Sequence, residues 1–305
     1  MVQKTLVKTS SKIKNGRATI TFNVIGYIYI GILAAICLLP FIILISGSFS
    51  SEQAIVIGGY SIIPREFSLE AYHIVFKYPE KILRAYGVSI LITLVGTICG
   101  LFLTTMAAYV ISRKDFKYRN IFSFYFYFTT LFNGGMISTY IFYIQYLHLK
   151  DSYIALILPG LFNVFYLLIM RTFVSTIPAS LAESGKIDGA GDFKIFIKII
   201  LPLSKSGLAT IGLFIALAYW NDWYNAMLYL NTATKFPLQY MLYDLLMQTQ
   251  AMARIASQAG IRVENLPSST LKLAMAVVAT GPIVLLYPFV QKYFVRGITI
   301  GSVKG

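Results

Sequence analysis

Charged residues are scarce in this 305-residue chain, since they make up only 12% of it. A soluble domain contains about 25% charged residues, which cover its water-facing surface. With 57% hydrophobic residues and a mean hydropathy of +0.70, the chain lacks the polar groups for such a surface. The composition therefore excludes an ordinary soluble protein and predicts a membrane protein.

Groups that carry catalysis are also sparse. The two cysteines, Cys37 and Cys99, both lie in apolar runs, which excludes a disulfide framework. The two histidines, His73 and His148, lie in separate predicted loops, so the spacing of a metal site is absent from the sequence. The sequence has no G-x-x-x-x-G-K-[ST] loop for nucleotide phosphates. These absences argue against a membrane enzyme, and no metal or cofactor is expected on the chain.

Acidic and basic side chains are nearly absent from the long apolar runs. Secondary transporters place ionisable groups there to bind protons or ions, despite the cost of burying them in lipid. Arg84 and Asp222 lie only at the ends of such runs, so no coupling site is visible. A channel is not favoured either, because no ring of polar residues or filter-like segment is present. The energy for transport would have to come from elsewhere, such as another subunit.

Six runs free of charge are long enough to cross a membrane. A helix needs about 20 residues to span a hydrocarbon core of about 30 Å. The runs are Val24–Ile45, Ala85–Ile111, Ile121–Leu147, Ser152–Met170, Ser206–Asn221 (which continues apolar past Asp222) and Leu273–Gln291, and the fourth and fifth are only just long enough. The sequence therefore predicts an all-α membrane protein with six transmembrane helices.

The segments between these runs alternate in charge. The N-terminal tail, residues 112–120, residues 171–205 and the C-terminal tail together hold most of the 26 basic residues and few of the 12 acids. Lys and Arg are enriched on the cytoplasmic side of membrane proteins. Both termini are therefore predicted to be cytoplasmic. The net charge of +14 is interpreted as an orientation signal, and no nucleic acid is expected as a partner.

The apolar runs also divide the chain. The predicted division is a basic cytoplasmic tail (1–22), a first transmembrane helix (23–47), an extracellular segment (48–83), a core with the other five helices (84–293) and a cytoplasmic tail (294–305). The core includes an inner loop at 175–204 and an extracellular segment at 231–270. A short helix is expected to open at Ser68. A helical apolar pattern runs from Tyr240 to Ala259, and predicts either a plain surface helix or a contact for an outside partner.

A polar, glycine-containing stretch, ESGKIDGAGDFKIFIKIILP, occupies 183–202 of the inner loop. Ser180 with Glu183 forms an S-x-x-E capping pair for a first helix. Residues 189–191 break that helix, because glycine allows a tight turn at positive φ. Asp192 is expected to cap a second, amphipathic helix, which Pro202 ends. The stretch predicts two short helices at the cytoplasmic surface, and this pattern alone also fits a hairpin that merely anchors the loop.

The same stretch resembles the E-A-A-x-x-x-G signature of binding-protein-dependent ABC importer permeases. The residues that carry the resemblance are Glu183, Ser184, Gly185, Asp188, Gly189, Ala190, Phe196, Leu201 and Pro202. Ser184 and Gly185 stand where the signature has two alanines. Both are small, so close packing survives although helix propensity falls. The resemblance implies that this stretch couples the chain to a separate ATPase by docking in a cleft of that subunit.

The C-terminus resembles one branch of that family. Residues 297–305, GITIGSVKG, look like the G-x-T-x-G-x-V-K-G ending of the carbohydrate-uptake branch, which includes the second permease of maltose importers. Within this branch the chain looks most like permeases for complex oligosaccharides or polysaccharide fragments in Gram-positive bacteria. The resemblance implies that the end of the tail reaches toward the ATPase dimer, through Gly301, Ser302, Val303, Lys304 and Gly305.

This resemblance implies a fold and a set of partners. The fold would be that of a type I ABC importer permease in the cell membrane, working by alternating access. The expected partners are a second permease that forms a heterodimer with this chain, a dimeric ABC ATPase that binds ATP and Mg, and an extracellular solute-binding protein that touches residues 231–270. The substrate would be an oligosaccharide, with membrane lipid around the helices. The chain itself would carry no catalysis.

The end of the fifth run could line an outer vestibule for sugar, through Tyr219, Trp220, Asn221, Asp222 and Trp223. Aromatic faces suit the C–H surfaces of sugars. However, Trp and Tyr also collect at bilayer interfaces, and Asp222 can simply face outer water. A different function is also open: a membrane scaffold or sensor that docks another cytoplasmic partner on the same loop. Co-purification separates the two, because only an importer requires a second permease and an ATPase.

Overall fold

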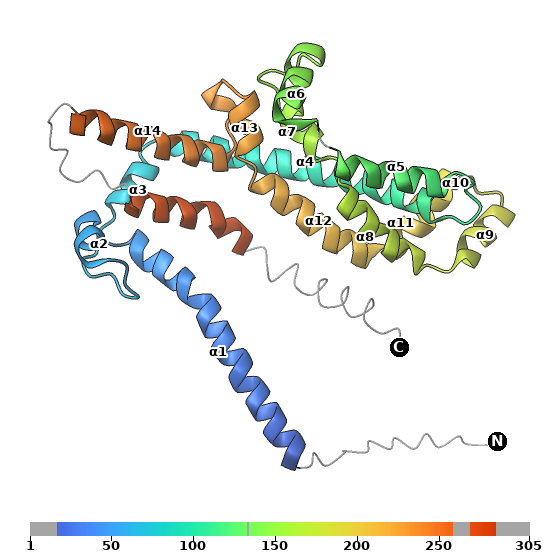
Figure 1. Ribbon diagram of the computed structural model, residues 1–305, viewed down its shortest axis with the longest axis horizontal. Helices are drawn as coiled ribbons and strands as arrows, with labels where there is room; N and C mark the ends of the chain where they lie inside the picture. The colour runs from blue at the N-terminus through green and yellow to red at the C-terminus, as the bar shows by residue number, and fades with distance from the viewer. Residues whose placement is uncertain (1–16, 133, 259–268, 285–305) are drawn as a thin grey trace.

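The computed structural model describes residues 17–132, 134–258 and 269–284. The first helix, α1 (Arg17–Ser48), runs apart from the other helices (Figure 1). Its apolar window is 0% buried within the structure, and Pro40 lies inside it. The predicted first transmembrane helix is thus present as one continuous helix, whose apolar surface is not covered by the described part of the chain.

A compact segment follows α1. It contains α2 (Glu52–Gly58) and α3 (Glu70–Val75), and the latter is the short helix expected near Ser68. The carboxylate of Glu52 accepts hydrogen bonds from the backbone N–H groups of Ser269 and Thr270 at 2.9 Å each. These residues begin the last described helix, Ser269–Val284. Glu52 therefore caps that helix and ties the segment to it.

Three helices form the centre of the structure. The longest is α4 (Pro79–Ser112), which makes its most extensive contacts with α12 (Lys205–Trp220) and α8 (Val164–Ser175) (Figure 1). With 34 residues, α4 is about 50 Å long. It therefore connects the end of the molecule that carries α3 to the end that carries the inner loop.

Small residues allow these three helices to approach closely. The ring of Tyr219 on α12 fills the space beside Gly96 and Gly160, where an added Cβ would lie 2.4 Å and 2.8 Å from its ring atoms. The Tyr219 hydroxyl donates a hydrogen bond to the carbonyl of Ile157 at 2.6 Å. In lipid, helices associate through such tight fits and internal hydrogen bonds. Tyr219 thus links α4 and α12 to the segment that precedes α8.

Two of the predicted transmembrane helices are broken. The run 121–147 forms α5 (Arg119–Leu131), then α6 (Gly135–Ile141) and the π-helix η1 (Phe142–Tyr146), so the expectation of one uninterrupted helix was wrong. Gly134 and Gly135 lie at the break, and Gly135 has a φ of +82°. The run 152–170 forms α7 (Ile154–Ile157), the 3₁₀ turn η2 (Leu158–Gly160) and α8, with a bend of 54°.

The segment after α12 contains three further elements, namely α13 (Tyr224–Tyr229), the 3₁₀ turn η4 (Ala233–Lys235) and α14 (Leu238–Gln258). The helix expected from Tyr240 onward is confirmed as α14, and Ala259 lies outside the described residues. The Asp151 carboxylate accepts hydrogen bonds from Lys235 Nζ at 2.7 Å and from the Asn231 backbone at 3.0 Å. Hydrogen bonds from Lys235 and Thr232 hold the pKa of Asp151 below its usual range. This pair anchors the segment to the start of the broken helix.

The described residues contain two helices that are long and apolar enough to cross a membrane, or four if each bent pair is one span. The two single helices are α1 and α4, and the bent pairs are α7–η2 with α8 and the run 192–203 with α12. The sixth predicted run is helical over Ser269–Val284, and the rest of it lies outside the described residues. The all-α fold is confirmed, whereas six spans and cytoplasmic termini stay predictions.

Replacing Gly96 by Ala is expected to destabilise the protein by about 1–3 kcal/mol, because the added Cβ would overlap the Tyr219 ring. Gly87→Ala is the matched control: it lies on the same helix, no described atom lies within 4 Å of its added Cβ, and alanine favours a helix. Thermal unfolding of both variants measures the difference. Equal melting temperatures would contradict the role given to Tyr219.

Candidate functional site

The inner loop connects α8 to α12 at the end of the bundle predicted to be cytoplasmic. It forms α9 (Ala179–Ile187), a turn at 188–191, α10 (Asp192–Ile195), the π-helix η3 (Phe196–Ile200) and α11 (Leu201–Leu203) (Figure 1). The run 192–203 meets α12 at a bend of 83°. The predicted pair of short helices is therefore confirmed, but Pro202 does not end the second one, because it lies in the first turn of α11, where its missing N–H is tolerated.

Two predicted caps were wrong. Pro178 stands at the N-cap of α9, and Ser180 lies inside the helix with Glu183, so the S-x-x-E capping pair does not form. Gly191 stands at the N-cap of α10, which makes Asp192 the first helical residue. The Asp192 carboxylate instead forms an ion pair with Arg113, which directly follows α4.

The turn between the two helices requires glycine at one position. Gly189 has a φ of +76°, which costs other residues about 1–2 kcal/mol. The Ala190 N–H donates to the Gly185 carbonyl at 2.9 Å, and the Gly189 N–H donates to the Lys186 carbonyl at 3.0 Å. This pair of bonds is the Schellman arrangement that ends a helix on glycine. The break predicted at residues 189–191 thus has a defined geometry.

One side of α9 packs against the chain. Gly185 is buried, and a Cβ there would lie 3.1 Å from Ile199 and 3.2 Å from Ile195. Phe196 is only 2% exposed and contacts the rings of Tyr109 and Phe102 on α4, with centroids 5.9 Å and 5.7 Å apart. Phe196 was predicted among the ATPase-coupling residues. The structure gives it an internal role, which is to seat the loop on α4.

The opposite side of α9 is exposed. Ser180, Glu183, Ser184 and Ile187 follow one another at helical spacing on the side away from Gly185, and all four are exposed. We call these four residues the α9 stripe. The Ile187 side chain is 86% exposed, a large apolar group without cover from the described residues. Asp188 and Gly189 are also exposed at the end of the helix, and Ala190 is half-buried.

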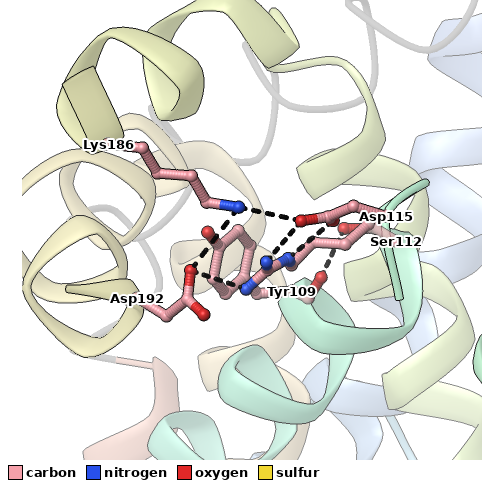
Figure 2. Close-up of polar contacts among 6 residues, drawn as sticks. Tyr109, Ser112, Asp115, Lys186 and Asp192 are labelled. Carbon is pink, nitrogen blue, oxygen red and sulfur yellow. Dashed lines mark hydrogen bonds and ion pairs between the residues drawn. The ribbon is translucent and has the colours of Figure 1, made fainter. Parts of the chain in front are cut away.

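Four charged side chains join the loop to the end of α4. Arg113 follows α4 directly and donates to Asp115 from Nε at 2.9 Å and from Nη2 at 2.5 Å (Figure 2). Its Nη1 lies 2.8 Å from the carboxylate of Asp192. Lys186 Nζ lies 2.8 Å from Asp115 and 4.0 Å from Asp192. We call Arg113, Asp115, Lys186 and Asp192 the charge quartet, which links α4, α9 and α10.

The electrostatics of the charge quartet favour its ionised form. Hydrogen bonds from Arg113 and then Lys186 hold the pKa of the Asp115 carboxyl well below its usual range. The Asp115 partner likewise raises the pKa of the Arg113 guanidinium. That guanidinium also lies 5.7 Å from the ring centroid of Tyr109. Arg113, Asp115 and Lys186 border a cavity of about 680 Å³, which Glu183 also lines.

The charge quartet was hardly visible in the sequence. Arg113 and Asp115 belong to the basic segment 112–120, and Lys186 lies in the polar stretch 183–202. The contacts that join the turn to the loop, Asp115 with Lys186 and Arg113 with Asp192, connect residues 71 or more positions apart, so spacing could not reveal them. The one available signal was an isolated acid, Asp115, within an otherwise basic turn.

Some of the residues predicted to line a sugar vestibule are buried in the structure, and others are exposed. Tyr219 and Trp220 are buried, and the Trp220 indole donates to the Ala279 carbonyl at 3.0 Å. Trp223 stacks on Tyr243 with centroids 4.4 Å apart, and Asn221 is exposed. The Asp222 carboxylate accepts hydrogen bonds from Asn225. The polar atoms of Tyr219 and Trp220 thus serve internal contacts, and of these two buried residues only Tyr219 lines the cavity described next.

A second cavity, of about 320 Å³, lies beside the broken helix. Asp222 and Tyr219 line it together with three polar residues that sequence reasoning missed, namely Asn163, Tyr166 and Asn225. These three come from α8, its cap and α13. Their pattern along the chain could not show that they meet, because the bend before α8 is not visible in the sequence. The predicted tail residues Gly301–Gly305 lie outside the described residues.

Replacing Asp115 by Asn is expected to lower the melting temperature slightly at neutral pH. Exposed ion pairs contribute about 0.2–1 kcal/mol, and Asp115 is 52% exposed. Its lowered pKa means that this stabilisation is fully present above the ordinary value of 3.8 and is lost as the pH falls through the folded value. Thermal unfolding at pH 7, 5 and 3 should show a difference between wild type and variant that shrinks only below about pH 4. A difference that vanishes between pH 7 and 5 would contradict this.

Comparison with known proteins places this geometry in a family. Residues 96–300 match the model of the binding-protein-dependent transport system inner membrane component. The chain is 43% identical, over 93% of its length and 98% of the relative's, to a polygalacturonan/rhamnogalacturonan transport system permease protein of Bacillus subtilis. It is 28% identical, over 92% and 95% of the two chains, to an arabinooligosaccharides transport system permease protein of Halalkalibacterium halodurans.

A solved structure is similar over nearly the whole chain. It is a crystal structure of a bacterial ABC transporter involved in the import of the acidic polysaccharide alginate. The TM-score is 0.72 at 29% identity, and the match covers 92% of this chain and 98% of the other. The matched family segment includes α9, its turn and the charge quartet, all of which lie between residues 96 and 300. The chain therefore belongs to the inner membrane components of binding-protein-dependent transport systems.

Proposed function

We propose that this chain is a permease subunit of an ATP-driven oligosaccharide importer in the cell membrane, and that it couples to a separate ATPase through the α9 stripe. Family membership supports the transport role. The names of the relatives, which refer to polygalacturonan/rhamnogalacturonan and arabinooligosaccharides, support a saccharide substrate. In this proposal the α9 end of the bundle faces the cytoplasm, as the distribution of Lys and Arg predicts.

The observation that carries the coupling role is the contrast between the two sides of α9. The inner side is fixed through Gly185 and the charge quartet. The outer side presents Glu183 and the exposed Ile187 with no cover from the described residues. An apolar side chain beside a carboxylate suits a protein cleft with an apolar floor and a basic rim. A loop that only anchored itself in the bilayer interface would need no exposed carboxylate next to Ile187.

Movement of α9 would reach the membrane helices along a short path. Lys186 pairs with Asp115 and Asp192 pairs with Arg113, which attaches the loop just beyond the end of α4, and Phe196 packs on Tyr109 of that helix. The run 192–203 then continues into α12 across the 83° bend. A shift of α9 that follows ATP binding would therefore act on α4 and α12 together. These two helices would open the bundle outward in alternating access.

The remaining partners are assigned to the rest of the surface. The solute-binding protein would contact residues 231–270, where α14 exposes Met252 and Ile255. The second permease would cover apolar surface on α1 and α5. None of the described side chains of α5 is buried. Lipid would cover the rest. ATP and Mg would bind the ATPase subunit, toward which the tail at 301–305 would extend.

Glu183→Lys is expected to abolish sugar-dependent ATP hydrolysis in the reconstituted importer while leaving membrane insertion intact, because a positive charge would face the basic rim of the cleft. Glu80→Lys is the control, since Glu80 is also exposed but lies at the end of α4 that is far from the charge quartet. Co-purification of the ATPase with each variant measures docking directly. Normal docking and uptake with Glu183→Lys would rule out the coupling role. A chain that never co-purifies with a second permease would favour the scaffold alternative.

Gly189→Ala is expected to reduce coupling more than Gly191→Ala. Both glycines are exposed in the same turn, and no described atom lies within 4 Å of either added Cβ. Only Gly189 has a positive φ, whereas Gly191 has a φ of −66°. Alanine at 189 therefore strains the turn by about 1–2 kcal/mol, and alanine at 191 does not. ATPase activity and uptake of the two variants, compared at equal expression, measure the effect, and equal activities would contradict it.

A further inference from the structure

The cavity of about 320 Å³ lies where a membrane-embedded helix is interrupted. The chain bends by 54° between η2 and α8. From this bend α8 runs 12 residues, or about 18 Å, to the inner loop, so the bend lies well inside a hydrocarbon core of about 30 Å. Non-helical backbone at that depth is tolerated only where it is buried in protein or lines a water-filled cavity. The break therefore indicates an aqueous or protein-lined space.

Polar side chains gather at this cavity although the neighbouring helices are apolar. They are Asn163, Tyr166, Asp222 and Asn225. Asn163 is exposed, and a polar side chain at this depth does not face lipid without a large cost. The volume is at the low end of the range for small-molecule sites, about 300–1,000 Å³.

The hydrogen-bonding groups at this cavity are only partly used. The Asn163 Oδ1 atom accepts from the Phe165 N–H at 2.9 Å, which leaves the amide nitrogen without a partner in the described chain. Asp222 accepts two hydrogen bonds from Asn225, at 3.0 Å and 2.8 Å, and a carboxylate has about four acceptor sites. Among the described residues, the Tyr166 hydroxyl makes no hydrogen bond. Donors on α8 and its cap thus oppose acceptors between α12 and α13.

This arrangement suits one type of ligand. A sugar hydroxyl both donates and accepts, so a neutral sugar ring can satisfy the amide of Asn163 and the carboxylate of Asp222 together. Among the described residues that line the cavity there is no Lys or Arg, and the one charged side chain is the acid Asp222. A uronate carboxylate would therefore enter without a cationic partner and beside a like charge, which is unfavourable in a desolvated site.

We infer that the cavity bordered by Asn163, Tyr166 and Asp222 is a binding subsite for a neutral sugar ring, and that it excludes uronate rings. The inference rests on the proposed transport function and adds a selectivity that the relatives' names do not supply. Those names include acidic polysaccharides, namely polygalacturonan and alginate. In a mixed oligosaccharide, the neutral rings would occupy this subsite, and acidic rings would be bound elsewhere in the importer.

Cysteine labelling of the assembled importer in nanodiscs tests this subsite. Ala218 lines the cavity and is exposed, so Ala218→Cys provides a reporter in a background where Cys37 and Cys99 are replaced by Ser. Maltotriose and arabinotriose serve as neutral probes and trigalacturonate as the acidic probe. At least one neutral probe is expected to slow maleimide labelling threefold or more, and trigalacturonate is expected to leave the rate unchanged. Ala276→Cys, which lies in a different cavity, should not respond to any of them.

A second variant tests the polar contact without removing the helix cap. Asn163→Ser keeps a cap acceptor but removes the amide donor. It should raise the concentration of neutral probe that halves the labelling rate by about 3- to 10-fold, the effect of one hydrogen bond. Protection by trigalacturonate, absence of protection by both neutral probes, or an unchanged response in Asn163→Ser would each overturn the subsite. Labelling does not depend on ATPase docking, so failure here is distinguishable from failure of the coupling role.

Discussion

The fit of Tyr219 between α4 and the broken helix is the constraint on which the rest of the structure depends. Its ring occupies the space left by Gly96 and Gly160, and its hydroxyl satisfies the Ile157 carbonyl near the break. Lipid chains are as apolar as the helices, so the hydrophobic effect does not drive helices together inside a bilayer. Shape and internal hydrogen bonds must do so instead, and Tyr219 supplies both. This contact also shapes the polar cavity at one end of α12, which Tyr219 lines.

The two ends of the bundle are consequently connected by stiff elements. The path from the α9 stripe to the cavity passes through the charge quartet, the continuous α4 and the α12 helix, with only short connections between them. Packed helices transmit displacement because protein interiors have low compressibility. In the proposed coupling, the 83° bend before α12 would turn a push from α9 along the membrane surface into a tilt of α12. This geometry suits a subunit that converts the work of a separate motor into a change of access.

The inner loop could be predicted from the sequence because its signals are local. Glycines that permit positive φ, an amphipathic pattern and a proline all lie within twenty residues. These signals were enough to predict α9, the turn at Gly189 and α10. Contacts between distant residues could not be predicted. Asp192 is of a residue type that suits an N-cap, and only the fold brings Arg113 close enough to pair with its carboxylate. Apolar composition likewise did not show that Gly134 and Gly135 interrupt a helix, or that Tyr219 and Trp220 point inward. Those outcomes depend on which surfaces meet in space.

The π-helix η3 fixes which way the inner loop faces. At Phe196–Ile200 the Leu201 N–H reaches back five residues to the Phe196 carbonyl, so this turn holds one more residue than an α-helical turn would. Deleting one residue there would let a regular helix run through and rotate α10 about 100° relative to α12. Asp192 would then turn away from Arg113, although neither residue had changed. A single-residue gap between positions 196 and 200 in an aligned relative would therefore mark a subunit whose inner loop faces a different direction from the one described for this chain.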